Sequence, residues 1–406
     1  MTRTGLSFAI ALIIGISFSG PLASANNDVD EAQLLALSLP SPERFGSKSV
    51  AVYVGENTET TSVYVNGRKV GEESFDYRYG SQPKPLSSIA GDHAITEGFF
   101  LVHPKKTEMV YIYIHGITDS AFQGKDIARD LFNAGHNVYS MRLSGHGTDS
   151  SNINNIDLKD WRQDVDDAVA KAKGLGKKVF LVGLSTGAAL AIDRAYRQPD
   201  GIEGVIAIAP AIGMKPIFAR IFGKLGLLNP LSKIIPYIGQ QKTTQLEVRQ
   251  PRKGTRGVYQ LYLLGRSIQA LINAGKPMPV PTFMVTSSAD EAIQENWVAK
   301  LLRLSKFNRW LRISATNKRL AEPPQEHFAE IVTETPPVHP GLPVSPNYLA
   351  HDFNPVAAQI EDGTRPMLDY VARDEQNIQF SAVTHEILRF SSYLRRENRC
   401  SILFSP

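Results

Sequence analysis

A serine lies between two glycines in the stretch GLSTG, which covers residues 183–187. An apolar run precedes this stretch, and the small residues Ala188 and Ala189 follow it. A G-x-S-x-G pattern between a strand and a helix is typical of a nucleophile elbow, where a strained turn exposes the serine oxygen and the neighbours must be small. This context favours a reactive Ser185 over an ordinary turn serine. The chemistry that it predicts is attack on an acyl carbon.

Acyl transfer also needs hydrogen-bond donors aimed at the oxygen on which negative charge develops. The stretch YIYIHGITDS, residues 111–120, ends an apolar strand with His115 and Gly116. Because the glycine frees the backbone, we expect the amide of Ile117 to be one donor and the amide of Thr186 to be the other. His115 is expected to orient this loop by hydrogen bonding rather than to react.

Three motifs follow one another along the chain: HGITDS at 115–120, RLSGHGTDS at 142–150 and GLSTG at 183–187. In their order and spacing the chain resembles the α/β-hydrolase fold. The branch that it looks most like contains monoacylglycerol lipases, lysophospholipases and serine aminopeptidases. The resemblance covers residues 97–209 and returns at 287–290. It implies a Ser-Asp/Glu-His triad in that chain order, with ester hydrolysis as the commonest activity.

The acid of such a triad follows a buried strand later in the chain. The stretch MVTSSADEAI places Asp290 just after an apolar run. By the resemblance, Asp290 would hold the tautomer of the catalytic histidine and stabilise its imidazolium form. The neighbouring Glu291 is the second candidate, and a surface-loop role for Asp290 is the alternative.

The base must come after the acid, which leaves four histidines as candidates: His327, His339, His351 and His385. The sequences around His327 and His385 look helical, so a structural role is expected there. His339 lies in the proline-rich stretch TPPVHPGLPVSP, which resembles a histidine loop of some bacterial members of this group. We therefore predict His339 as the base, although its separation from Asp290 is longer than the family usually shows.

Strands and helices must bring these residues together. Apolar, β-branched or aromatic runs predict strands at 49–54, 62–68, 99–102, 110–114, 137–141, 178–183, 204–210, 281–287 and 309–314. Helical patterns occupy 122–134, the segment that Asp157 caps, and 187–197. Near-continuous apolar strands that alternate with amphipathic helices indicate an α/β fold, with a mostly parallel sheet covered on both faces.

Residues 211–278 interrupt this alternation with an apolar segment broken by glycine and proline. Inserted between two strands, it is predicted to form a cap or lid over the strand ends, where ligands bind in such sheets. Helices packed on a small core of their own are the alternative. The basic stretch RQPRKGTR, residues 249–256, is most simply a solvated loop. Its alternative is transient contact with an anionic substrate or a membrane surface.

The N-terminus has the features of a secretory signal peptide. Arg3 precedes an uncharged apolar core, and ASA at 23–25 fits a cleavage site. We predict a signal peptide over residues 1–25, a hydrolase domain over 26–406, and export to the periplasm or the medium. Cys400 is the only cysteine, so no intrachain disulfide can form.

Composition is ordinary for a globular protein, with 42% hydrophobic and 21% charged residues and a formal net charge of +4. Nothing in this balance indicates a nucleic-acid partner. Metal-site, P-loop and dinucleotide motifs are absent from the sequence, so no metal and no cofactor are implied. The oligomeric state stays open.

These observations predict an exported serine hydrolase that cleaves carboxyl esters, and lipid-like esters in particular because the predicted cap is apolar. A peptidase or thioesterase with the same triad is one alternative. Glu247 is the only acid within residues 211–278, which counts against recognition of a free amine by an aminopeptidase. A noncatalytic binding protein that kept the fold is the other alternative.

Overall fold

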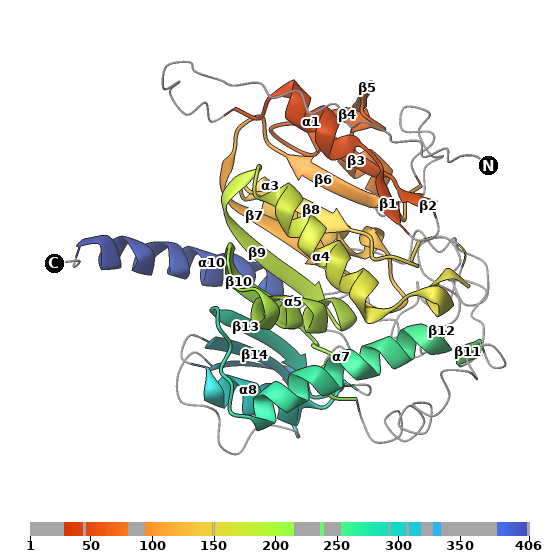
Figure 1. Cartoon of the computed structure of the whole chain (residues 1–406). Helices are drawn as coiled ribbons and strands as arrows, with labels where there is room; N and C mark the ends of the chain where they lie inside the picture. Colours follow the sequence, from red (N-terminus) through yellow and green to blue (C-terminus); the bar gives the residue numbers. More distant parts are fainter. Residues whose placement is uncertain are drawn as a thin grey trace, which may run out of the picture.

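The protein is described by a computed structural model (Figure 1). The described residues are 28–43, 46–79, 94–147, 149, 151–214, 236–238, 253–290, 293–305, 308–317, 328–333 and 380–403. Several predicted features lie outside this part of the chain: the signal peptide, Glu291, His327, His339, His351 and much of the cap.

An eleven-stranded sheet runs through the centre of the described residues, in the order β15-β14-β13-β10-β9-β7-β8-β6-β3-β4-β5 (Figure 1). The strands from β8 to β15 pair in parallel, β6 is antiparallel to β8, and β3, β4 and β5 form an antiparallel meander at one edge. Their bounds are β3 Val50–Val54, β4 Thr61–Val65, β5 Arg68–Glu73, β6 Gly98–Val102, β7 Thr107–Ile114, β8 Asn137–Met141, β9 Gly176–Leu184, β10 Ile202–Ile208, β13 Thr282–Ser287, β14 Asn308–Ala315 and β15 Phe328–Thr333.

Helices cover both faces of this sheet. One face packs against α1 Glu31–Ser38, α4 Leu158–Ala172, α5 Thr186–Arg197, α7 Thr255–Asn273 and α8 Glu295–Leu304. The other packs against α2 Phe75–Tyr79, α3 Lys125–Asn133 and α10 Phe380–Leu403. Residues of β7 alternate between the two cores, with Ile112 on the first and Tyr111 on the second. This alternation explains why the strand reads as continuously apolar.

Many predicted elements are confirmed. The strand at 137–141 has the predicted bounds, and the hairpin of β4 and β5 turns at Asn66, whose φ of 53° suits the NG turn. Asp157 caps α4 in a capping box with Asp160. The helical interpretation around His327 is wrong for the residues that follow it, because Phe328–Thr333 form strand β15 beside β14. Pairing with the edge strand β14 stabilises a strand at these residues more than their local pattern favours a helix.

Residues 28–79 precede the first of the three motifs and attach to the sheet at several points. Leu34 and Leu37 of α1 join the same core as α4 and α5. Arg129 of α3 pairs with Asp76 at 2.8 Å, and Lys171 of α4 donates to Ser41 Oγ at 2.6 Å. The N-terminal segment is therefore built into the sheet and its helical layers.

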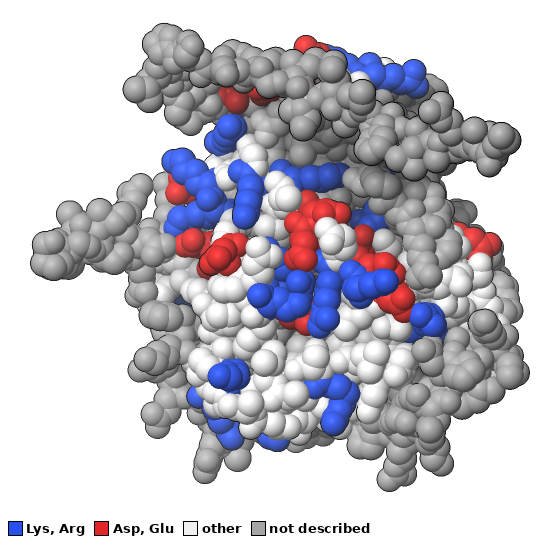
Figure 2. All heavy atoms as spheres, in the orientation of Figure 1, with Lys and Arg blue, Asp and Glu red and all other residues white. Residues whose placement is uncertain are grey.

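Ion pairs join α4 to α5 on the face shown in Figure 2. Arg162 pairs with Asp193 at 2.6 Å, and Arg194 pairs with Asp166 at 2.6 Å. Lysine, arginine and acidic side chains interleave across the middle of this face, whereas the coloured atoms of its lower part include lysine and arginine among uncharged residues (Figure 2). Between these two helices the paired charges compensate one another locally.

The described part of the predicted cap includes helix α7, whose Leu261, Leu264 and Ile268 are buried in the core beside α5. The cap as a whole stays a prediction. Over the described ranges, no helix combines the length and apolar character that a membrane crossing requires.

Candidate active site

Ser185 occupies the turn between β9 and α5 with φ 53° and ψ −107°. This is a strained backbone conformation for a residue with a side chain, as the elbow requires. Its N–H donates to Ile208 O at 2.9 Å, and its carbonyl accepts from Ala211 N–H at 3.0 Å. Ser185 is half-buried whereas Leu184 and Thr186 are buried. The turn thus presents the serine and covers its neighbours.

The two glycines of the motif are required by close approach of backbone. A Cβ on Gly187 would overlap the carbonyl oxygen of Ile114, the last residue of β7. A Cβ on Gly183 would overlap the amide of Ala188 in the first turn of α5. The strand and the helix of the elbow can pack this tightly only without those side chains.

The predicted oxyanion loop lies beside the nucleophile. A Cβ added to Gly116 would be 3.7 Å from the Cβ of Ser185. The next residue in the chain is Ile117, the predicted amide donor. Thr186, the other predicted donor, begins α5 and is fully buried. The structure therefore brings the loop 115–118 and the elbow together, as expected.

His115 has the orienting role that its position predicts. Its Nε2 accepts the N–H of Leu143 at 3.0 Å, so the proton of the neutral ring lies on Nδ1. Nδ1 then donates to Gly116 O at 2.8 Å. Burial, and secondarily His146, lower the pKa of His115 well below its ordinary value, so the ring is neutral near pH 7.

His146, within the second motif, contacts the same loop. Its Nε2 lies 2.8 Å from Ile117 O, and its Nδ1 lies 3.2 Å from Ser144 O. Burial lowers the pKa of His146 below its ordinary value, so the ring carries one proton. We assign that proton to Nε2 because its contact is the shorter.

Asp290 lies three residues beyond the end of β13 and is 6% exposed. Its Oδ1 accepts the N–H of Ile293 at 2.9 Å. The chain that leaves β10 holds this loop, since Met214 bridges to Ile293 and the N–H of Gln294 donates to Gly213 O at 2.8 Å. The carboxylate is therefore fixed rather than free on the surface.

Strand register brings Asp290 and Ser185 to the same end of the sheet, where the parallel strands have their carboxyl ends. Leu184 of β9 pairs with Ile208 of β10, which pairs with Val285 of β13. The strand that precedes Ser185 (β9) and the strand that precedes Asp290 (β13) are two strand spacings apart, a distance of about 10 Å. An imidazole with a hydrogen bond at each nitrogen spans a gap of this order.

Among the candidate bases, only His385 is described. It lies on α10 and is exposed, while Ile387 and Leu394 of the same helix are buried in the core. The predicted docking of this helix is confirmed. The part of the chain that the structure describes contains no cluster of three or more metal-ligating side chains.

Residues 105–306 match a family model described as serine aminopeptidase, S33. The match contains both predicted oxyanion donors, the elbow and Asp290. This region is an α/β-hydrolase of the monoacylglycerol lipase-like branch.

Two curated relatives of this chain are lipases by name. The thermostable monoacylglycerol lipase of Bacillus sp. (strain H-257) is 30% identical over 112 residues, which are 28% of this chain and 44% of that protein. The human monoglyceride lipase is 23% identical over 223 residues, which are 50% of this chain and 72% of that protein. The match to the Bacillus protein thus spans less than half of that relative's length.

A solved structure of a soluble variant of monoglyceride lipase from Saccharomyces cerevisiae, in complex with a substrate analog, is 15% identical to this chain. The alignment covers 54% of this chain and 81% of that chain, with a TM-score of 0.45.

The loop 142–147 has no role that its sequence predicts, although it belongs to the second motif. Two of its residues, Leu143 and His146, bond directly to the oxyanion loop. The repeated spacing of a histidine beside a glycine, at 115–116 and 146–147, was a signal. The partners of these histidines could not be read from it, because they are backbone groups of distant segments.

Proposed function

We propose that the protein is a serine hydrolase that cleaves carboxyl esters through an acyl-enzyme intermediate. The observation that carries this proposal is the strained backbone of Ser185, with the Gly116 backbone beside it and the buried Asp290 at the same sheet edge. Strained backbone of this kind clusters at active sites, which favours a catalytic serine over the noncatalytic alternative.

In the proposed reaction, Ser185 Oγ attacks the ester carbonyl while the base accepts its proton. The amides of Ile117 and Thr186 stabilise the oxyanion, and Asp290 supports the imidazolium. The protonated base then gives its proton to the leaving alcohol. Water, activated by the same base, releases the acid and restores the serine.

We assign the role of general base to His339 because of the direction in which strand β15 runs. This strand is parallel to β14, so Thr333 ends it at the edge of the sheet that carries Ser185 and Asp290. His339 follows Thr333 by six residues, a length of chain that reaches about 20 Å. His327 instead precedes Phe328, which begins β15 at the opposite edge.

The substrates that we propose are lipid-like esters with a single acyl chain. Both curated relatives are named for lipases that act on monoacylglycerols or monoglycerides. Apolar side chains also border the site, since a Cβ on Gly257 of α7 would contact both Ile117 and Ile153. The cap over residues 211–278 is proposed to complete the acyl-chain pocket.

Labelling with a fluorophosphonate tests the reactive serine directly. We expect the probe to label Ser185, mapped by peptide mass spectrometry, and to abolish turnover of p-nitrophenyl esters. A panel of increasing chain length, with monoacylglycerol and aminoacyl p-nitroanilide added, separates a lipase from a short-chain esterase and from a peptidase. Absence of labelling in a folded protein would favour the noncatalytic alternative.

The other triad members need separate variants. Asp290→Asn is expected to lower kcat by about 10³–10⁴-fold because the histidine would lose the partner that fixes its tautomer. His339→Ala should have an effect of similar size, and His385→Ala serves as the matched control. Near wild-type turnover of His339→Ala would reject this assignment of the base.

We also propose export, on the signal-peptide pattern of residues 1–25. N-terminal sequencing of the protein from the periplasmic and medium fractions of the producing cells is expected to begin at Asn26. A mature protein that still begins at Met1 would contradict cleavage.

A further inference from the structure

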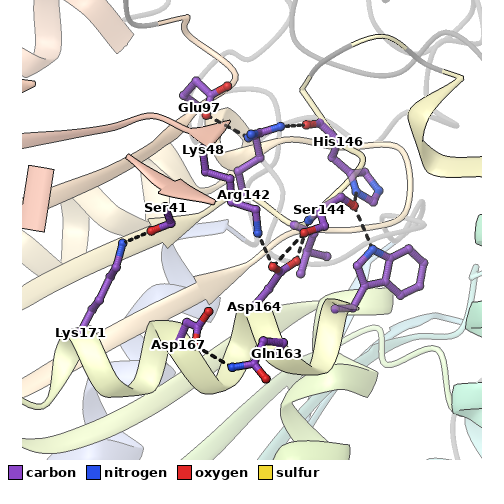
Figure 3. A network of polar contacts seen from close by, with 12 residues as sticks. Ser41, Lys48, Glu97, Arg142, Ser144, His146, Gln163, Asp164, Asp167 and Lys171 are labelled. Carbon is purple, nitrogen blue, oxygen red and sulfur yellow. Dashed lines mark hydrogen bonds and ion pairs between the residues drawn. The ribbon is translucent and has the colours of Figure 1, made fainter. Parts of the chain in front are cut away.

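We propose that Lys48 and Asp164 are positioning residues of the oxyanion hole. Through them the N-terminal segment, which precedes the matched region 105–306, sets the geometry of the site. This inference rests on the hydrolase function proposed above. Both residues act through the loop 142–147 (Figure 3).

A largely buried ion pair is the first link. Lys48, the last residue of β2 (Gly46–Lys48), pairs with Asp164 of α4, and their side chains are 11% and 9% exposed. The same carboxylate accepts the N–H of Ser144 at 2.6 Å and its hydroxyl at 2.9 Å. One acid thus holds the N-terminal segment with one oxygen and the loop with both (Figure 3).

The second link runs from the loop to the predicted oxyanion donor. The indole N–H of Trp161 donates to Ser144 O at 3.1 Å, which fixes the other side of this residue. The adjacent Leu143 N–H binds His115 and thereby places the His115 proton on the nitrogen that holds Gly116 O. Gly116 O and Ile117 N–H belong to one planar peptide group, so fixing the first fixes the direction of the second.

The third link holds the next peptide of the oxyanion loop. His146 contacts Ile117 O at 2.8 Å through Nε2. The backbone carbonyl of His146 accepts from Arg142, and Arg142 pairs with Glu97 at 2.9 Å. Two successive peptides of the oxyanion loop are therefore held from the loop 142–147, which Asp164 anchors.

The charge of Lys48 matters as well as its contact. Without it, Asp164 would be a largely buried carboxylate that lacks its cation, and such a group draws in water or rearranges. The Lys48 charge also adds to the effects of burial and of His146 that lower the pKa of His115. A neutral His115 is needed, because only an unprotonated Nε2 can accept from Leu143.

Variants of the network should therefore damage turnover more than substrate binding. For Lys48→Met and Asp164→Asn we expect kcat on p-nitrophenyl butyrate to fall about tenfold, with KM within about twofold of wild type. This is less than the loss of a whole oxyanion donor, since the donor is displaced rather than removed. Inhibition by a short-chain trifluoromethyl ketone, whose adduct carries the oxyanion, should weaken by a similar factor.

Lys171→Met is the matched control. Lys171 is also on α4 and also binds the N-terminal segment, through Ser41 at 2.6 Å (Figure 3). It lies two turns beyond Asp164 along the helix, so its loss leaves the bonds of Ser144 in place. We expect its kcat and its inhibition constant to match the wild type.

Two outcomes decide the inference. If Lys48→Met and Asp164→Asn melt at lower temperature but keep wild-type kcat and inhibitor affinity, their role is structural and the proposal is wrong. If Lys48→Met does not fold, Ser144→Ala replaces it, since it removes only the 2.9 Å hydroxyl bond to Asp164. A Ser144→Ala variant with wild-type kcat would then overturn the proposal.

Failure of the hydrolase function itself is distinguishable. A wild-type protein without ester turnover or fluorophosphonate labelling contradicts the proposed function alone. Amide hydrogen exchange in peptides covering residues 111–120 then tests the network without catalysis. We expect faster exchange in Lys48→Met and Asp164→Asn than in Lys171→Met, and equal exchange would overturn the inference.

Discussion

The elbow at 183–187 and the predicted oxyanion loop at 115–118 lie side by side but are held by different means. The elbow is fixed by backbone: Ser185 bonds to the main chain of β10, and Gly187 packs directly on the end of β7. The predicted oxyanion loop has one backbone bond of its own, from Asp119 N–H to Gly116 O at 3.2 Å, and is otherwise fixed by the side chains of His115 and His146. A backbone-built turn can be recognised from five residues, whereas a side-chain-built loop depends on segments far apart in the chain.

This difference makes two kinds of vulnerability. The stability of the elbow should fall when a side chain is added to one of its glycines. Its activity should depend on the hydroxyl of Ser185. The predicted oxyanion loop should respond to protonation, because His115 must stay neutral for its Nε2 to accept the N–H of Leu143.

Ser185→Ala should have the largest effect on activity. We expect ester turnover to fall by at least about 10⁴-fold, as for other triad serines. The melting temperature should stay near that of the wild type, because the backbone bonds of the elbow remain. Turnover by the purified variant close to the wild-type rate, with an unchanged circular dichroism spectrum, would end the nucleophile assignment.

Gly187→Ala should be the most damaging change to stability in the elbow. The added Cβ overlaps Ile114 O, a backbone atom that cannot move without displacing β7. We expect a loss of about 3 kcal/mol or more in the free energy of unfolding, measured by urea titration.

Gly135→Ala is the control for this substitution. Gly135 has φ 87° and open space around its Cβ, so only backbone strain of about 1 kcal/mol is expected. Equal losses for the two variants would show that crowding at the elbow is unimportant.

Acid should destabilise the fold through the two buried histidines beside the predicted oxyanion loop. The pKa values of His115 and His146 are lowered by burial, so the unfolded chain binds more protons than the folded one below the ordinary value of about 6.5. Their contribution to stability is fully present above that pH and is lost as the pH falls. The slope is at most about 1.4 kcal/mol per pH unit for each histidine.

A His146→Gln variant isolates one of these terms. Arg142 and Asp119 also act on the His146 ring, and both remain in the variant. Between pH 7.5 and 5.5 the wild type should lose about 1 kcal/mol more than His146→Gln in urea unfolding. Identical pH dependence would mean that His146 is not buried in its neutral form.

Strain at the nucleophile should give the smallest measurable effect. Ser185→Gly places the residue that tolerates φ 53° and ψ −107° best at the turn, whereas Ser185→Ala keeps the strain. We expect the glycine variant to be more stable than the alanine variant by about 1 kcal/mol. A glycine variant that is the less stable of the two would argue against stored strain.

The sequence by itself determined the elements and the local chemistry of the site. Alternating apolar strands and amphipathic helices predicted the parallel sheet, and the residues of β8 were predicted without error. The glycines around Ser185 predicted the strained turn, and the position of Asp290 after an apolar run predicted its place at the sheet edge. These features are local, because turn chemistry and side-chain periodicity are written within a few residues of one another.

Only the tertiary structure decided how the oxyanion loop is held. Lys48, Asp164 and His146 belong to a strand, a helix and a loop that meet because the chain is folded, and no periodicity relates them. The strand β15 shows the same limit, since a segment with a helical pattern pairs with β14 once that edge exists. A hydrogen bond from a buried side chain to a distant backbone group depends on where both partners lie in space. The sequence around the side chain carries no information about the position of its distant partner.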